Sequence, residues 1–142
     1  MGDSFAPFVG LILKQSNLTE VEIIGDLYNP VDGEVLTDIV NDHITEDDFI
    51  IAIDACLGEK NKVGYIMITE NAISPGKCVD NVLPSIGNIG IAGIVNAKEK
   101  DAYLNLHTLA YYTPLSRVYK MAEIIAKSIY NSVKLIYKES PQ

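Results

Sequence analysis

The sequence predicts an α/β fold, with helices on both faces of a mixed, mainly parallel sheet. Residues 49–53 and 89–96 are apolar runs without polar alternation, which is typical of strands covered on both faces. Residues 114–138 repeat apolar side chains with the 3.6-residue period of a helix. Because the chain has 142 residues and 48% are hydrophobic, we expect one globular domain over residues 1–142.

The first half of the chain is expected to alternate helix and strand. Residues 4–15 predict a helix with Asp3 or Ser4 as its N-cap. Residues 20–24 predict a strand, and a turn-rich loop follows it. Residues 32–42 predict a second helix, before the apolar strand 49–53. The inward face of this second helix is expected to consist of Val35, Leu36, Ile39 and Val40.

The second half is expected to contain two strands, a long loop and the long helix. Residues 63–69 predict a strand, and residues 74–88, "SPGKCVDNVLPSIGN", predict a loop rich in Gly and Pro. Loops of this length in compact domains are usually functional or mobile. In the strand 89–96, Gly90 and Gly93 leave room for another backbone or a ligand.

Charge and cysteine content exclude several classes of protein. The net charge is −8, with 19 acidic against 11 basic residues, which argues against nucleic-acid binding. The two cysteines, Cys56 and Cys78, form no CxxC motif, so we expect a reduced, cytoplasmic protein. No apolar run approaches the ~18 residues of a membrane-spanning helix, so no membrane partner is expected.

The sequence contains no recognisable motif for a metal or a nucleotide cofactor. His43 and His107 belong to no HxxxH or HExxH pattern, so no metal is expected. The glycines of "GNIGIAG" form neither a GxGxxG fingerprint nor a P-loop, so no nucleotide cofactor is expected. We interpret His43 as a solvated residue at a helix end, His107 as a partly buried side chain and Cys56 as a buried thiol.

Asp54 is the first candidate catalytic residue. It directly follows the apolar run 49–53, and ligands of open α/β sheets bind outside the carboxyl ends of strands. A carboxylate held rigidly and partly dry suits acid–base chemistry, because burial raises the pKa of a carboxyl group. The alternative is structural: Asp54 caps the turn that follows the strand.

Asp3 is the second candidate catalytic residue. An N-cap role, worth ~1 kcal/mol, is the structural alternative. However, a helix N-terminus that faces the strand ends is also where α/β active sites lie. Two carboxylates that meet there would share one proton, leaving one as base and one as acid. That pair would be sufficient for water-mediated hydrolysis of an amide.

Three longer stretches resemble a known family. "IIAIDACLGEKNKVGYIMI", "ISPGKCVDNVLPSIGNIGIAGIVN" and "TPLSRVYKMAEIIAKSI", with the opening "GDSFAPFVG", resemble the YyaC family of sporulation proteins, relatives of the germination protease. The resemblance implies a three-layer α/β/α sandwich of the phosphorylase/hydrolase type. It also implies an acid peptidase site whose two aspartates match Asp3 and Asp54. Small acid-soluble spore proteins would be the substrates, in the cytoplasm of a sporulating cell or in the spore compartment.

The chain also departs from that family. The family's strand ahead of the first helix is absent from this sequence, and its usual arginine after threonine is Pro114 here. Candidate substrate-binding residues are Ser74, Pro75, Gly76 and Asn96. Two alternatives stay open, a catalytically inactive protein-binding module and, less favoured, a metal-assisted maturation protease. A homo-oligomer also stays open.

Overall fold

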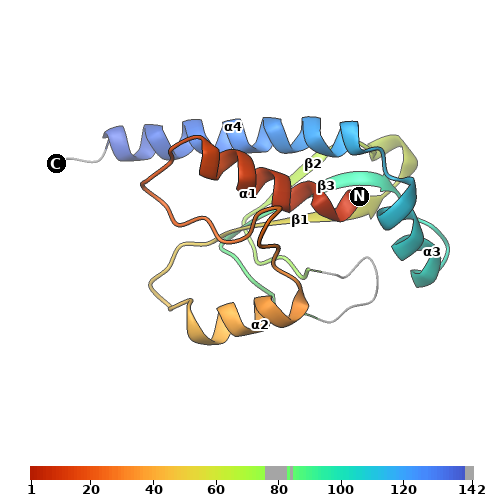
Figure 1. The fold of residues 1–142 in the computed structure, drawn as a ribbon, viewed down its shortest axis with the longest axis horizontal. Helices are drawn as coiled ribbons and strands as arrows, with labels where there is room; N and C mark the ends of the chain where they lie inside the picture. Colours follow the sequence, from red (N-terminus) through yellow and green to blue (C-terminus); the bar gives the residue numbers. More distant parts are fainter. Residues whose placement is uncertain (76–82, 84, 140–142) are drawn as a thin grey trace.

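The computed structural model describes residues 1–75, 83 and 85–139, and Figure 1 shows their arrangement. Three strands and four α-helices make up the described fold, which confirms the mixed α/β class. Their order along the chain is α1 Phe5–Gln15, α2 Gly33–Asp42, β1 Ile51–Gly58, β2 Ile66–Thr69, β3 Ile89–Ala97, α3 Ala102–His107 and α4 Leu115–Glu139. A 3-10 turn precedes α1, a second one follows β1, and a π-helical segment joins α3 to α4. Their bounds are Gly2–Ser4, Lys60–Lys62 and Thr108–Tyr112.

The three strands form one mixed sheet in the order β1-β3-β2. β1 runs parallel to β3, and β2 runs antiparallel to β3. The described sheet therefore contains one pair of each kind, where the sequence predicted a mainly parallel sheet. Among the described residues β1 is an edge strand, since only β3 pairs with it.

The hydrophobic core lies between one face of the sheet and the helices α1 and α4. Phe5, Val9 and Val118 are fully buried there. Phe5 lies directly on the sheet because Gly93 of β3 has no side chain: a Cβ at Gly93 would lie 2.8 Å from Cε1 of Phe5. The core face of α4 consists of Val118, Met121, Ala122, Ile125, Ala126, Ile129 and Val133. This confirms the predicted helices at 4–15 and 114–138.

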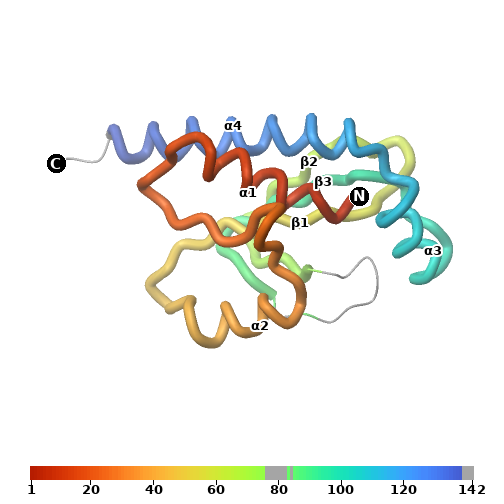
Figure 2. Tube along the Cα trace, viewed as in Figure 1, coloured from red at the N-terminus to blue at the C-terminus, as the bar shows by residue number. Residues whose placement is uncertain are grey.

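Residues 20–24 do not form the predicted strand. Val21 and Ile23 pack against the core. Lys134 of α4 also binds the Glu20 carboxylate, at 2.5 Å. A strand, however, needs a neighbour to complete its backbone hydrogen bonds. No described strand pairs with this segment, which Figure 2 traces between α1 and α2.

The helix α2 forms where the sequence predicts it, and Leu36, Ile39 and Val40 of its predicted inward face are half-buried. Asp32 caps the helix, with its carboxylate accepting the amides of Glu34 and Val35 at 3.1 and 3.0 Å. None of the residues of α2 is buried, and Val35 is 40% exposed. Figure 1 shows α2 on the opposite side of the strands from α1 and α4. Among the described residues, the apolar stripe of α2 is therefore covered only in part.

Two strand boundaries differ from the sequence prediction. β1 begins at Ile51 and continues to Gly58, past the expected end at residue 53. β2 begins at Ile66 instead of residue 63, because the chain turns first: Gly64 has a φ of +92°, and Tyr65 donates its N–H back to Lys62. The strand predicted at 89–96 is confirmed as β3. Within the described part of the chain, no helix has the length and apolar character needed to cross a membrane.

Candidate functional site

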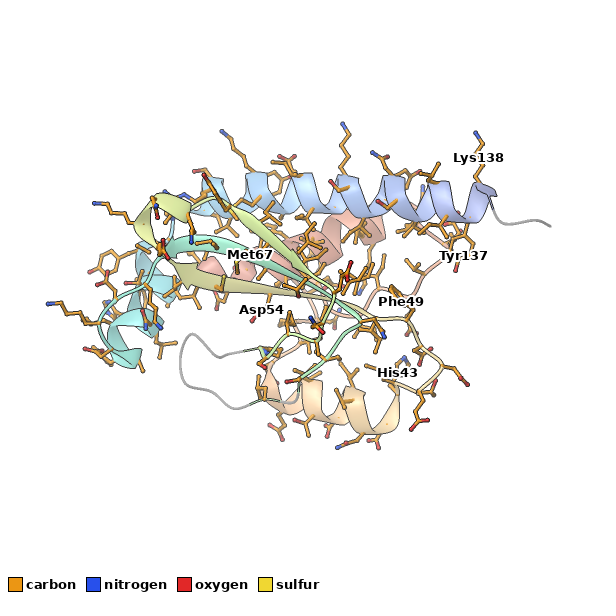
Figure 3. All side chains as sticks on the ribbon, turned by 180° about the vertical axis from the view of Figure 1, so that it is seen from behind. His43, Phe49, Asp54, Met67, Tyr137 and Lys138 are labelled. Carbon is orange, nitrogen blue, oxygen red and sulfur yellow. The ribbon has the colours of Figure 1, made fainter. Side chains whose placement is uncertain are left out.

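Asp54 lies in the middle of β1, so the prediction that it ends the strand is wrong. Its neighbours Ile53 and Ala55 point toward the core formed with α1 and α4. Since successive side chains of a strand alternate, Asp54 projects from the other face of the sheet. It pairs with Ala92 of β3, which in turn pairs with Met67 of β2. Asp54 is half-buried, and within the described residues the hydrophobic core lies on the opposite face of β1, so a carboxylate is tolerated in mid-strand. Figure 3 labels Asp54 and Met67.

The Asp54 carboxylate is held at the outer edge of β1. Its Oδ1 accepts the N–H of Ala55 at 2.9 Å. The carbonyl oxygens of Ile50 and Gly58 accept hydrogen bonds from backbone amides at the two ends of β3, so the backbone groups of these even-numbered residues point toward β3. Backbone groups of alternate residues point to opposite edges of a strand, so the N–H of Ala55 points outward. Asp54 therefore does not cap a turn after the strand, as the structural alternative predicted. Its carboxylate accepts a hydrogen bond from the next residue of the same strand, Ala55.

Asp3 lies in the turn Gly2–Ser4, and this turn contacts β1. Its carboxylate lies 2.9 Å from the Met1 amino group, and its side chain is 70% exposed. Neither Asp3 nor Ser4 makes the predicted side-chain cap of α1. The turn that holds Asp3 thus contacts the strand that holds Asp54. However, it leads into α1, which packs on the face of the sheet opposite to the one from which Asp54 projects. The sharing of a proton between the two carboxylates stays a prediction.

Two of the candidate substrate-binding residues flank a small antiparallel bridge. Ile73 pairs with Ile86, and the hydroxyls of Ser74 and Ser85 lie 3.0 Å apart beside them. Ser74 is exposed and Pro75 is half-buried. Gly76 lies outside the described residues. Their contact with a substrate stays a prediction.

Asn96 joins the end of β3 to the segment before α4. Its side-chain amide donates to the carbonyl of Tyr112 at 3.2 Å and to the hydroxyl of Thr113 at 3.4 Å. Its side-chain oxygen accepts the N–H of Ala97 at 2.9 Å. These hydrogen bonds give Asn96 a structural role, and its contact with a substrate stays a prediction.

Sequence analysis missed a polar network around the π-helical segment. The buried hydroxyl of Thr113 donates to the carbonyl of Thr108 at 3.0 Å. Arg117 donates to the carbonyl of Val95 at 2.9 Å, and buried Asn105 accepts the N–H of Glu99 at 2.7 Å. In the sequence, these residues are visible only as polar positions among apolar ones within 105–117. This pattern does not indicate which groups they bind.

The two histidines lie in different surroundings. His107 is half-buried, and its ring centroid lies 6.0, 4.8 and 5.4 Å from those of Tyr103, Tyr111 and Tyr112. This confirms the partly buried interpretation. His43 is the C-cap residue of α2, and its Nε2 lies 2.9 Å from the Glu22 carboxylate. Across the described residues, no three potential metal ligands cluster together.

Two ion pairs fasten the segment after α1 to the helical layer. The hydrogen bond from Lys14, with those from the amides of Asn29 and Tyr28, lowers the pKa of Asp26 to about 2. Asp26 is 4% exposed, and its Oδ2 lies 2.6 Å from Nζ of Lys14. The second ion pair joins Glu20 to Lys134 of α4. The hydrogen bond from Lys134 lowers the pKa of Glu20, and the same hydrogen bond raises the pKa of Lys134.

An open cleft of about 320 Å³ lies beside α2. Its walls combine two isoleucines with three carboxylates and a histidine: Glu22, Ile24, Asp38, Ile39, Asp42 and His43. Figure 3 shows His43 well apart from Asp54. The cleft is therefore a separate feature from the surroundings of Asp54.

Comparison with known proteins identifies the family. A family model described as "Protein of unknown function (DUF1256)" matches residues 1–128. The chain is 37% identical to the "Uncharacterized protein YyaC" of Bacillus subtilis (strain 168) over 130 residues, which are 90% of this chain and 62% of that protein. The chain thus spans less than two thirds of the length of this curated relative. No solved structure matches this chain. The chain belongs to the DUF1256 family, and the predicted resemblance to YyaC is confirmed.

Proposed function

We propose that this member of the DUF1256 family is a peptidase-like hydrolase in which Asp54, with Asp3, activates water for cleavage of a peptide bond. One observation carries the proposal: the turn that holds Asp3 lies against β1, the strand that holds Asp54. The Ala55 N–H fixes the Asp54 carboxylate at the outer edge of that strand. An acid and a base on two adjacent elements are the minimum that acid–base hydrolysis of an amide needs. Asp54 is held by the Ala55 N–H, whereas Asp3 is 70% exposed and has to move toward the substrate.

In the proposed reaction, ionised Asp54 takes a proton from a water molecule as that water attacks the peptide carbonyl. The C–N bond then breaks, and a protonated Asp3 donates its proton to the leaving nitrogen. Asp3 must leave the Met1 amino group to do so. A bound peptide would favour this step, because a substrate that covers Asp3 removes water and stabilises the neutral acid.

The finer assignments rest on the resemblance to the germination protease. They are a three-layer sandwich of the phosphorylase/hydrolase type, small acid-soluble spore proteins as substrates, and the cytoplasm of a sporulating cell as the compartment. The half-exposed face of the sheet that carries Asp54 is compatible with access by a peptide.

The test is a cleavage assay with matched variants. Wild type, Asp54→Asn, Asp3→Asn and Asp48→Asn are incubated with acid-soluble spore protein extract, and fragments are identified by mass spectrometry. Asp48→Asn removes the same charge from an exposed carboxylate that bonds to Thr45. We expect fragments from wild type and Asp48→Asn, and a loss of ~100-fold or more in Asp54→Asn. Equal cleavage by Asp54→Asn would refute the assignment.

A protein-binding module on the same fold is the second candidate function. The observation that favours it is the absence of buried residues on α2, which leaves an amphipathic helix uncovered. In that case neither wild type nor Asp54→Asn cleaves the extract, and both bind the same partner with equal affinity.

A further inference from the structure

The apolar stripe of α2 is only partly covered by the part of the chain that the structure describes. Val35, Leu36, Ile39 and Val40 follow helical spacing, yet none of them is buried. By contrast, the same kind of stripe on α1 buries Phe5, Val9 and Leu13. Amphipathic helices gain most of their stability by burying such a stripe. The stripe of α2 is therefore a surface suited to contact with another apolar face.

The charges on α2 also oppose its own stability. Glu34, Asp38 and Asp42 recur every four residues, so they form an acidic ridge beside the apolar stripe. Like charges at this spacing destabilise a helix. Asp42 lies at the negative end of the helix dipole, and the last turn has no basic residue. A ten-residue helix with these features lacks what usually stabilises short helices, namely packing and compensating positive charge.

The surroundings of α2 extend this negative charge. Residues 20–48 contain ten acidic residues and no lysine or arginine. Lysines of α4 and α1 bind two of these carboxylates, Glu20 and Asp26. Three others, Glu22, Asp38 and Asp42, line the 320 Å³ cleft together with Ile24 and Ile39. The walls of the cleft thus combine apolar and acidic side chains in one place.

We propose that α2 and its cleft form a docking surface for a basic amphipathic helix of a partner protein. Its apolar residues pack on Val35, Ile39 and the cleft, and its lysines or arginines lie against the ridge of Glu34, Asp38 and Asp42. Helix-in-groove recognition of this kind uses anchors at i, i+4 and i+7, and opposite charges set orientation and association rate. The proposal does not depend on catalysis at Asp54.

The probe is a fluorescently labelled synthetic helix of about five turns, with Leu on one face and Lys on the other. Its anisotropy is titrated with wild type and with two double variants. Asp38→Lys/Asp42→Lys is expected to weaken binding about tenfold or more, because each change replaces attraction by repulsion. Glu70→Lys/Glu123→Lys makes the same change in net charge at exposed sites outside α2 and is expected to weaken binding less than about twofold.

Two further controls separate the apolar stripe from general charge attraction. A Lys/Ser peptide of equal charge should bind the wild type about tenfold more weakly than the Leu/Lys helix. Val35→Ser/Ile39→Ser should remove that difference while circular dichroism and the urea midpoint confirm an intact core. Equal binding of the two peptides, or equal loss in both charge-reversal variants, would overturn the proposal. Sedimentation gives a third outcome that would overturn the proposal. If the wild type self-associates with rising concentration and Val35→Ser/Ile39→Ser abolishes this, the occupant of the surface is a second copy of this chain.

Discussion

The helices α1 and α2 have similar lengths and similar amphipathic patterns, but only α1 contributes buried residues to the core of the described chain. α1 places Phe5 and Val9 in the core, where both are fully buried. α2 buries no residue and carries an acidic ridge along its apolar stripe. The pattern in a sequence therefore predicts that a helix has a face to cover, and only tertiary contacts decide whether that face is covered.

The difference also predicts uneven stability across the molecule. Elements with many buried apolar contacts open only with global unfolding, whereas uncovered elements open locally. The layer of α1, β1, β3 and α4 should therefore unfold as one unit, and α2 should open independently of it.

The largest expected effect comes from truncating the core. Phe5→Ala should lower the free energy of unfolding by ~3–5 kcal/mol, because it leaves a cavity between α1 and β3. Ile39→Ala on α2 should cost less than ~1 kcal/mol, since Ile39 is only partly buried. Urea denaturation followed by circular dichroism measures both. Equal losses for the two variants would show that α2 is packed after all.

A smaller effect is expected where α1 meets the segment that leads to α2. A Cβ at Gly10 would lie 2.0 Å from the carbonyl oxygen of Gly25, so Gly10→Ala must push this segment away from α1. We expect a loss of ~1–3 kcal/mol in urea denaturation. Ser128→Ala, an exposed change on α4, is the control and should leave stability nearly unchanged. A stable Gly10→Ala protein would refute the close packing of these two backbones.

The ion pair at the same junction should produce a pH dependence. The folded-state pKa of Asp26 is about 2, below its ordinary value of 3.8. Its contribution to stability is therefore present above pH 3.8 and is lost as pH falls toward 2. Asp26→Asn should lower stability at neutral pH and flatten the acid limb between these values. Melting temperatures from pH 2 to 6 test this, and an unchanged acid limb in Asp26→Asn would contradict it.

The smallest global effect is expected for the cap of α2. Asp32→Ala removes the carboxylate that accepts the amides of Glu34 and Val35, which costs the helix ~1 kcal/mol. Because α2 opens on its own, the urea midpoint should hardly move while helical signal is lost. A shift of the midpoint equal to the full capping energy would show that α2 unfolds together with the core.

Sequence reasoning succeeded where local pattern and burial agree. The periods of α1 and α4 and the apolar run of β3 located these elements to within a residue or two. It failed at residues 20–24, because a local sequence pattern cannot show whether a strand has a hydrogen-bonded neighbour, and no described strand pairs with this segment. It also failed at the end of β1. A carboxylate after five apolar residues looked like a strand end, yet the strand continues, and within the described residues only one of its faces lies in the hydrophobic core.

The candidate site was predictable only as a set of residues. The sequence indicated Asp54 and Asp3 but not the bond to Ala55 or the pairing of Asp3 with Met1. It also did not reveal that Asn96 is engaged with Tyr112 and Thr113. The contacts of Asn96 join residues that are distant in the sequence, and the bond between Asp54 and Ala55 depends on the local direction of the backbone. The periodicity of a sequence gives no information on either.

Native-state hydrogen exchange of the wild-type protein tests the contrast between the two helices most directly. Amides of α2 from residue 37 to 42 and amides of α4 from 121 to 133 are compared in the same sample. We predict that α2 exchanges through local opening, with an opening free energy several kcal/mol below that of α4. Equal protection of α2 and α4, at the global free energy of unfolding, would contradict the account, because it would show that α2 is already part of the packed core.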